Sequence, residues 1–175
     1  MEYKLATSTW GKEEIKAIQD VIDTDTFSMG PKVKEYERQF ADFFGSKYGV
    51  MCSSGSTANL LMVASLFFSK NPKLQAGDEI IVPAVSWSTT YFPLQQYGLN
   101  LKFVDIDIDT LNYNLVDLES AITSKTKAIM IVNLLGNSND FNVINGLIKD
   151  KDIVVIEDNC ESMGAKLDGK FTGTF

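Results

Sequence analysis

Two stretches near the start of the chain place apolar residues at helical spacing. The first predicts a helix over residues 10–24, with Thr9 in the N-cap position. The second begins at Pro31, a residue favoured in the first turn of a helix, and predicts a helix over residues 31–44. Together they predict a helical N-terminal segment over residues 1–45.

Over residues 46–175 the pattern changes to short apolar runs that alternate with helical periodicity. Five short apolar runs are predicted to form strands: residues 48–52, 79–83, 101–105, 128–133 and 153–157. Helices are expected between most of them, over residues 56–69, 87–97, 116–122 and 141–150. A turn about Asp168 and Gly169 predicts a small hairpin over residues 166–172. The alternation predicts an α/β fold with a mostly parallel sheet and crossover helices.

Composition narrows the classes of function. The chain has 175 residues, enough for one domain with a sizeable core, and its net charge of −7 without a basic patch argues against a nucleic-acid partner. No apolar run is long enough for a membrane span and no leader pattern begins the chain, so we expect no membrane partner and a cytoplasmic location. Two cysteines and no histidine exclude a disulfide framework, a Ser-His-Asp or Cys-His site and most zinc chemistry, and no metal is expected.

A carboxylate is the first candidate for chemistry. The apolar run ending at Ile156 is followed at once by Glu157 and Asp158. A buried parallel strand that ends in this way presents an acid at the carboxyl edge of the sheet, where α/β proteins bind ligands. Asp158 could pair with a pyridine nitrogen and keep it protonated, although a single acid is equally suited to a structural cap.

Two further loops are predicted to reach the same edge. Gly55, Ser56 and Thr57 open a helix, and a helix N-terminus with small residues and hydroxyls can hold a phosphate, although alone a plain helix cap is the favoured reading. Trp87 starts the next helix and could stack on a heteroaromatic ring, although alone core packing is favoured. Together with Asp158 these features predict a site for a planar phosphorylated ring, such as pyridoxal 5′-phosphate.

The order of these motifs carries a family resemblance. Ser-Ser-Gly-Ser-Thr-Ala-Asn over residues 53–59, the Glu157-Asp158 pair and Gly164-Ala165 resemble the sugar aminotransferase family named after DegT and StrS. The resemblance spans essentially the whole chain and implies the N-terminal portion of an incomplete large domain of a fold-type I pyridoxal-phosphate-dependent transferase, with the C-terminal part absent.

The resemblance also implies roles for individual residues. Gly55 and Ser56, with the neighbouring hydroxyl of Thr57, would bind the cofactor phosphate. Trp87 would stack on the ring, and Asp158 would hold the ring nitrogen. Glu161 would lie near the cofactor or the sugar. No catalytic residue is expected within the chain, because the Schiff-base lysine or the histidine base of such enzymes would lie beyond residue 175.

Within the family, three stretches are closer to the nucleotide-sugar 3-dehydratases than to ordinary aminotransferases: residues 84–91, 133–137 and 157–164. This implies an enzyme of lipopolysaccharide or deoxysugar synthesis that uses pyridoxal or pyridoxamine 5′-phosphate. It would remove the 3-hydroxyl of a 4-keto-6-deoxy sugar on a nucleotide carrier, and would be a homodimer when full length. Three alternatives remain: a sugar aminotransferase, a catalytically inactive truncated domain, and an unrelated α/β binding domain.

Overall fold

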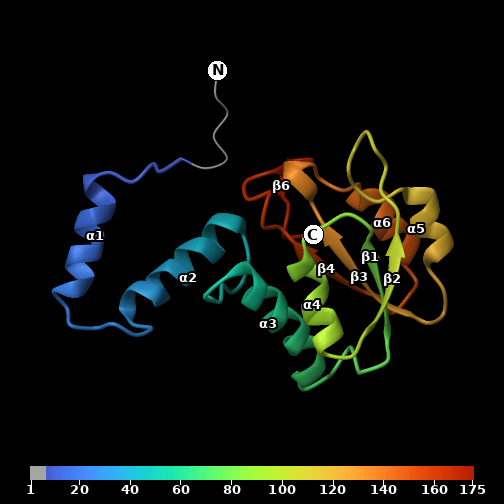
Figure 1. Ribbon diagram of the computed structural model, residues 1–175, viewed down its shortest axis with the longest axis horizontal. Coiled ribbons are helices and arrows are strands. Elements are labelled where there is room, and N and C mark those ends of the chain that lie inside the picture. The colour runs from blue at the N-terminus through green and yellow to red at the C-terminus, as the bar shows by residue number, and fades with distance from the viewer. Residues whose placement is uncertain (1–6) are drawn as a thin grey trace. The chain divides into compact units, whose positions relative to one another are not determined.

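The computed structural model describes residues 7–175 (Figure 1). By its internal contacts the chain divides into two compact units, Met1–Val50 and Met51–Phe175. The first unit contains the helices α1, Lys12–Ile22, and α2, Pro31–Phe44. The second contains the sheet. No helix in the described part of the chain has both the length and the apolar character to cross a membrane.

Helix α1 begins later than its apolar pattern predicts. Its N-cap is Gly11, so the prediction of Thr9 as the N-cap was wrong. The Glu14 carboxylate accepts a hydrogen bond from the Gly11 N–H at 2.6 Å, and this contact closes the first turn. Helix α2 has the predicted bounds, with Pro31 as its first residue and Gly45 in the left-handed conformation at its end.

The second unit is built on a four-stranded parallel sheet, which confirms the predicted α/β fold. Its strands are β1, Glu79–Pro83, β2, Asn100–Val104, β3, Thr126–Val132, and β4, Val154–Asp158. Their order is β2-β1-β3-β4. The predicted strand over residues 48–52 was wrong, because this segment is coil outside the sheet. An apolar run becomes a strand only beside a sheet edge that pairs with it.

Helices cover both faces of the sheet (Figure 1). Helices α3, Gly55–Phe68, and α4, Ser88–Gln96, contact each other on one face. Helices α5, Leu115–Ala121, and α6, Phe141–Ile148, lie on the other. A short 3-10 turn, Leu134–Gly136, follows β3, and the predicted hairpin forms from β5, Lys166–Leu167, and β6, Lys170–Phe171.

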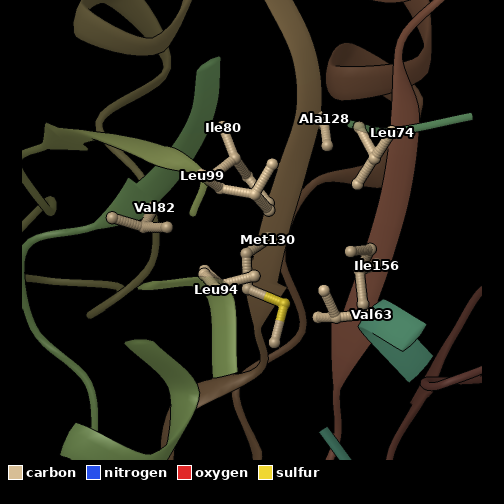
Figure 2. Close-up of a cluster of buried hydrophobic side chains, with 9 residues drawn as sticks. All are labelled: Val63, Leu74, Ile80, Val82, Leu94, Leu99, Ala128, Met130 and Ile156. Atoms are coloured by element: carbon tan, nitrogen blue, oxygen red, sulfur yellow. The ribbon is translucent and has the colours of Figure 1, made fainter. Parts of the chain in front are cut away.

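Alternation along the strands divides the core into two clusters. Ile80 and Val82 point toward α3 and α4, together with Met130 of β3 (Figure 2). Ile81 and Ile129, which lie between them in sequence, belong to the cluster under α5 and α6. Successive side chains of a strand point to opposite faces, and a strand buried on both faces is apolar throughout. By the same alternation, Glu157 and Asp158 at the polar end of β4 point to opposite faces of the sheet.

Candidate functional site

The site is built around Asp158, the last residue of β4, whose side chain is only 7% exposed. Its Oδ2 atom accepts hydrogen bonds from Asn59 Nδ2 at 2.8 Å and from Thr90 Oγ1 at 2.9 Å. Its Oδ1 atom accepts from the backbone N–H of Cys160 at 3.3 Å. The carboxylate therefore connects the end of β4 with α3 and α4.

Asn59 and Thr90 are functional candidates that the sequence reasoning missed. Both are almost fully buried, with 4% and 1% of their surface exposed. A signal was present for Asn59, because it precedes the run LLMVASLFF and is a polar residue within an apolar helix. A buried amide in such a place needs hydrogen-bond partners, and here one of them is the Asp158 carboxylate.

The first turn of α3 holds the predicted phosphate residues. Ser54 is the N-cap, and its hydroxyl accepts from the Thr57 N–H at 3.3 Å. The Thr57 hydroxyl donates back to the Ser54 carbonyl at 2.9 Å, so its proton is directed into the cap. Gly55 and Ser56 are exposed, and a Cβ added at Gly55 would meet no atom within 4 Å. The first turn is therefore open to solvent at Gly55 and Ser56, and an α-helix leaves the N–H groups of this turn without intrahelical partners.

Trp87 is the N-cap residue of α4 and is 71% exposed, so core packing is wrong as its explanation. Its backbone carbonyl accepts from the Thr90 N–H at 3.0 Å. This backbone bond places Trp87 one turn before the threonine that contacts Asp158. An exposed indole at the start of that helix is suited to cover a flat ligand.

Glu161 has a contact that its sequence position did not predict. Its Oε2 atom accepts from the Leu135 N–H at 3.0 Å. Leu135 is exposed and has φ 53° and ψ 25°, the left-handed region that non-glycine residues seldom adopt. Glu161 therefore holds a strained turn between β3 and α6 beside the end of β4.

Buried asparagines fix that turn. Asn139, 1% exposed, donates through Nδ2 to the Val132 carbonyl at 2.8 Å and lies 3.1 Å from Asn112 Oδ1 and 3.2 Å from Asn133 Oδ1. Asn133 in turn donates to Asn159 Oδ1 at 3.3 Å. This asparagine network, Asn112, Asn133, Asn139 and Asn159, ties the loop after β3 to the loop after β4.

Two ionisable groups beside Asp158 are perturbed. Partial burial, then the negative charge of Asp158 and a hydrogen bond to it, and then the charge of Glu161 together raise the pKa of the Cys160 thiol to about 11. Burial also raises the pKa of Glu157. Hydrogen bonds that its carboxylate accepts from the Gly173 and Phe175 N–H groups lower this pKa and oppose part of the increase. Cys160 is therefore a protonated thiol at neutral pH.

The predicted site residues thus lie on neighbouring elements at the carboxyl edge of the sheet. Asp158 is joined to the helix of Gly55 and Ser56 through Asn59, and to the helix of Trp87 through Thr90. Glu161 is joined to the loop after β3 through Leu135. The arrangement offers helix N-terminal donors, an exposed indole and a buried carboxylate, which is the donor set suited to a phosphorylated heteroaromatic ring.

Comparison with known proteins adds a family match. The model of the DegT/DnrJ/EryC1/StrS aminotransferase family matches residues 8–175. GDP-4-keto-6-deoxy-D-mannose 3-dehydratase of Yersinia pseudotuberculosis is 65% identical over 175 residues, which are 100% of this chain and 44% of that protein. GDP-perosamine synthase of Escherichia coli O157:H7 is 34% identical over 168 residues, 96% of this chain and 44% of that protein.

A solved structure gives the same result. The E. coli GDP-4-keto-6-deoxy-D-mannose-3-dehydratase with bound hydrated PLP superposes with a TM-score of 0.97 at 64% identity, covering 99% of this chain and 45% of that one. The chain therefore spans less than half the length of the relatives that it matches.

Proposed function

Because the chain belongs to the DegT/DnrJ/EryC1/StrS aminotransferase family, we propose that it forms the cofactor-binding part of an enzyme that uses pyridoxal or pyridoxamine 5′-phosphate. The proposed reaction is removal of the 3-hydroxyl from a nucleotide-linked 4-keto-6-deoxy sugar, as the name of the 65% identical Yersinia relative states for that protein. The observation that carries the cofactor assignment is the buried Asp158 carboxylate, held by two side-chain donors at the carboxyl edge of the sheet.

The residues present fit the phosphate end of this cofactor. Gly55 and Ser56 are exposed at the first turn of α3, and the space in front of the Gly55 Cα is open. A helix N-terminus stabilises a phosphate through its free N–H groups and its dipole. In this proposal Gly55 and Ser56 bind the phosphate, and Thr57 keeps the turn in shape through its bonds to Ser54.

The residues also fit the ring. When bound, the cofactor supplies an electron-withdrawing pyridinium that stabilises negative charge on the substrate carbon. Asp158 holds the proton at the ring nitrogen, and the Trp87 indole covers one face of the ring and excludes water. Cys160 stays a protonated thiol at neutral pH, so it is a poor competitor for a reactive carbonyl. In this proposal Glu161 lies beside the cofactor or the sugar, and its carboxylate also accepts a hydrogen bond from the Leu135 N–H.

Transamination is the second candidate, because the family whose model matches residues 8–175 is an aminotransferase family. The two reactions differ in the residue that moves protons at the substrate. The chain has no histidine, and we propose that a lysine or histidine from polypeptide outside these residues supplies that function. Products distinguish the reactions, since dehydration removes the 3-hydroxyl and transamination adds an amine.

A hybrid enzyme tests the proposal. Residues 1–175 replace the matching 175 residues of the Yersinia 3-dehydratase, and the hybrid is assayed with glutamate, cofactor and GDP-4-keto-6-deoxymannose. We expect loss of the 3-hydroxyl, and Asp158→Asn is expected to weaken cofactor binding at least tenfold, because a neutral amide no longer stabilises the ring-nitrogen proton. A hybrid that folds but binds cofactor equally well with and without Asp158 would contradict the assignment.

We further propose a homodimeric, cytoplasmic enzyme. Apolar residues of α1 are exposed, including Ile15, Ile18 and Ile22, and they are suited to pack against further protein. Cys52 and Cys160 form no disulfide, which fits a reducing compartment. Light scattering of the hybrid at several concentrations tests the dimer, and a monomer at all of them would contradict it.

A further inference from the structure

We propose that Asn59 and Thr90 act as a clamp that fixes the orientation of the Asp158 carboxylate toward the ring nitrogen, and that Pro93 enables the clamp. This role is one of positioning and rests on the cofactor assignment proposed above. The clamp is defined by the two bonds to Oδ2, from Asn59 Nδ2 at 2.8 Å and Thr90 Oγ1 at 2.9 Å.

The orientation of the Asn59 amide is determined by its neighbours. Nδ2 donates to the Asp158 carboxylate and also lies 3.3 Å from the Thr89 carbonyl. Both partners are acceptors, and an amide oxygen in that position would face two oxygens. One Nδ2 proton therefore points to each acceptor, and this fixes the orientation of the Asn59 amide.

Pro93 explains why the Thr89 carbonyl is available. In an α-helix the N–H of residue 93 would donate to the carbonyl of residue 89, but a proline has no N–H. Pro93 lies inside α4 and is buried. Its presence leaves the Thr89 carbonyl to accept from Asn59, so a residue that is unfavourable within a helix contributes an acceptor to the clamp.

The hydroxyl of Thr90 has a single direction as well. Its one proton goes to Asp158 Oδ2, so in its 3.0 Å contact with the Ser86 hydroxyl it must accept. Ser86 and Thr90 thus form a chain of donors that ends on the Asp158 carboxylate. All three groups are at least partly buried, where such bonds hold a geometry well.

The clamp leaves the other oxygen for the ligand. Two donors occupy Oδ2, whereas Oδ1 accepts from the Cys160 N–H at 3.3 Å, a longer contact. A carboxylate oxygen can accept more than one bond, so Oδ1 has capacity for the ring N–H. With Oδ2 held from two helices, the carboxylate cannot rotate about its terminal bond without losing two buried hydrogen bonds.

The test uses the hybrid enzyme described above, titrated with pyridoxamine 5′-phosphate. Thr90→Val removes the hydroxyl while keeping the shape, Thr90→Ser restores it, and Asn59→Leu removes the amide. The control is Thr126→Val, since Thr126 is equally buried and donates to the Glu79 carboxylate at 2.8 Å at the opposite end of the sheet. Absorbance of the bound cofactor is followed against pH to report protonation of the ring nitrogen.

We expect Thr90→Val and Asn59→Leu each to weaken cofactor binding about tenfold and to move the ring-nitrogen titration to lower pH, since a misoriented carboxylate stabilises that proton less. Thr90→Ser is expected to restore both values, and Thr126→Val to leave both within about twofold. Pro93→Ala is expected to shift the titration in the same direction while the helix becomes more stable, because residue 93 regains an N–H for the Thr89 carbonyl.

The outcomes separate the clamp from the proposed function. Wild-type titrations in Thr90→Val and Asn59→Leu, with binding lost in Asp158→Asn, overturn the clamp and leave the cofactor assignment intact. Unchanged binding in Asp158→Asn overturns both. If Thr90→Val does not fold, the ring-nitrogen titrations of Asn59→Leu and Pro93→Ala decide, and wild-type titrations in both overturn the clamp. Pro93→Ala is not expected to lose stability.

Discussion

Replacing Asn139 by alanine tests how the turn beside Asp158 is held. The Asn139 side chain is buried, and its Nδ2 group donates to the Val132 carbonyl at 2.8 Å and lies 3.1 Å from Asn112 Oδ1. A third acceptor, Asn133 Oδ1, lies at 3.2 Å but also receives the Asn139 backbone N–H at 3.0 Å. Alanine keeps that backbone bond and removes the others.

The size of the effect follows from the acceptors left behind. In Asn139→Ala the Val132 carbonyl and Asn112 Oδ1 lose this donor within a buried region. A buried polar group left without its partner costs about 1–3 kcal/mol. The alanine variant is therefore expected to lose about 3 kcal/mol of unfolding free energy, a large part of the stability of an ordinary domain. Asn139→Asp should lose more, because its oxygens face carbonyl oxygens.

The assay is urea unfolding of the chain, followed by circular dichroism. Asn142→Ala is the matched control, since this exposed asparagine makes a single 3.3 Å bond to Asp168 and its loss should cost less than about 0.5 kcal/mol. In the hybrid enzyme the same Asn139 variant should weaken cofactor binding, because the network supports the Leu135–Glu161 contact. Equal unfolding midpoints for Asn139→Ala and Asn142→Ala would refute the reasoning.

Three further expectations concern ionisable side chains. Tyr113→Phe removes a buried hydroxyl that donates to a β3 carbonyl at 2.6 Å, so its unfolding free energy should fall by about 1 kcal/mol in urea titrations, and an unchanged value would contradict this. In a variant with Cys52 replaced by serine, the rate at which iodoacetamide alkylates Cys160 should be low at pH 8 and increase as the pH approaches the pKa of about 11. Asp158→Asn should increase the rate, because it removes a negative charge beside the thiol. A fast reaction at pH 8 would be inconsistent with the raised pKa. Burial raises the pKa of Glu157 above 4.5, so the folded chain binds this proton more tightly than the unfolded chain, and its contribution to stability falls as pH rises through that window. Glu157→Gln does not titrate and should show a smaller fall over the same pH range in urea unfolding; parallel curves would argue against this.

Much of the fold was predictable because buried parallel strands leave a strong pattern. The apolar run at residues 79–83 could be assigned to β1 with its observed bounds, since a strand covered on both faces needs apolar residues at every position. Residues 48–52 are also mostly apolar but form no strand of the sheet. The difference is set by pairing with a neighbour, which composition alone does not report.

The site was predictable in part for the same reason. Asp158 could be found because a strand ends at it, and Trp87 because it starts a helix at the same edge. Asn59 and Thr90 could not be assigned to Asp158, because they lie 99 and 68 residues away in the chain and meet it only through tertiary packing. The contact of Glu161 with Leu135 depends on a left-handed backbone that no residue pattern indicates.

The pleat of β4 separates two acids that are neighbours in sequence. Asp158 turns toward α3 and α4, whereas Glu157 receives the N–H groups of Gly173 and Phe175, whose ring stacks on Phe141 of α6. Asp158 faces the proposed cofactor site, whereas Glu157 holds the following polypeptide on the other side of the sheet. A substitution of either acid can therefore leave the contacts of the other in place, whereas exchanging the two residues would disrupt both sets of contacts at once.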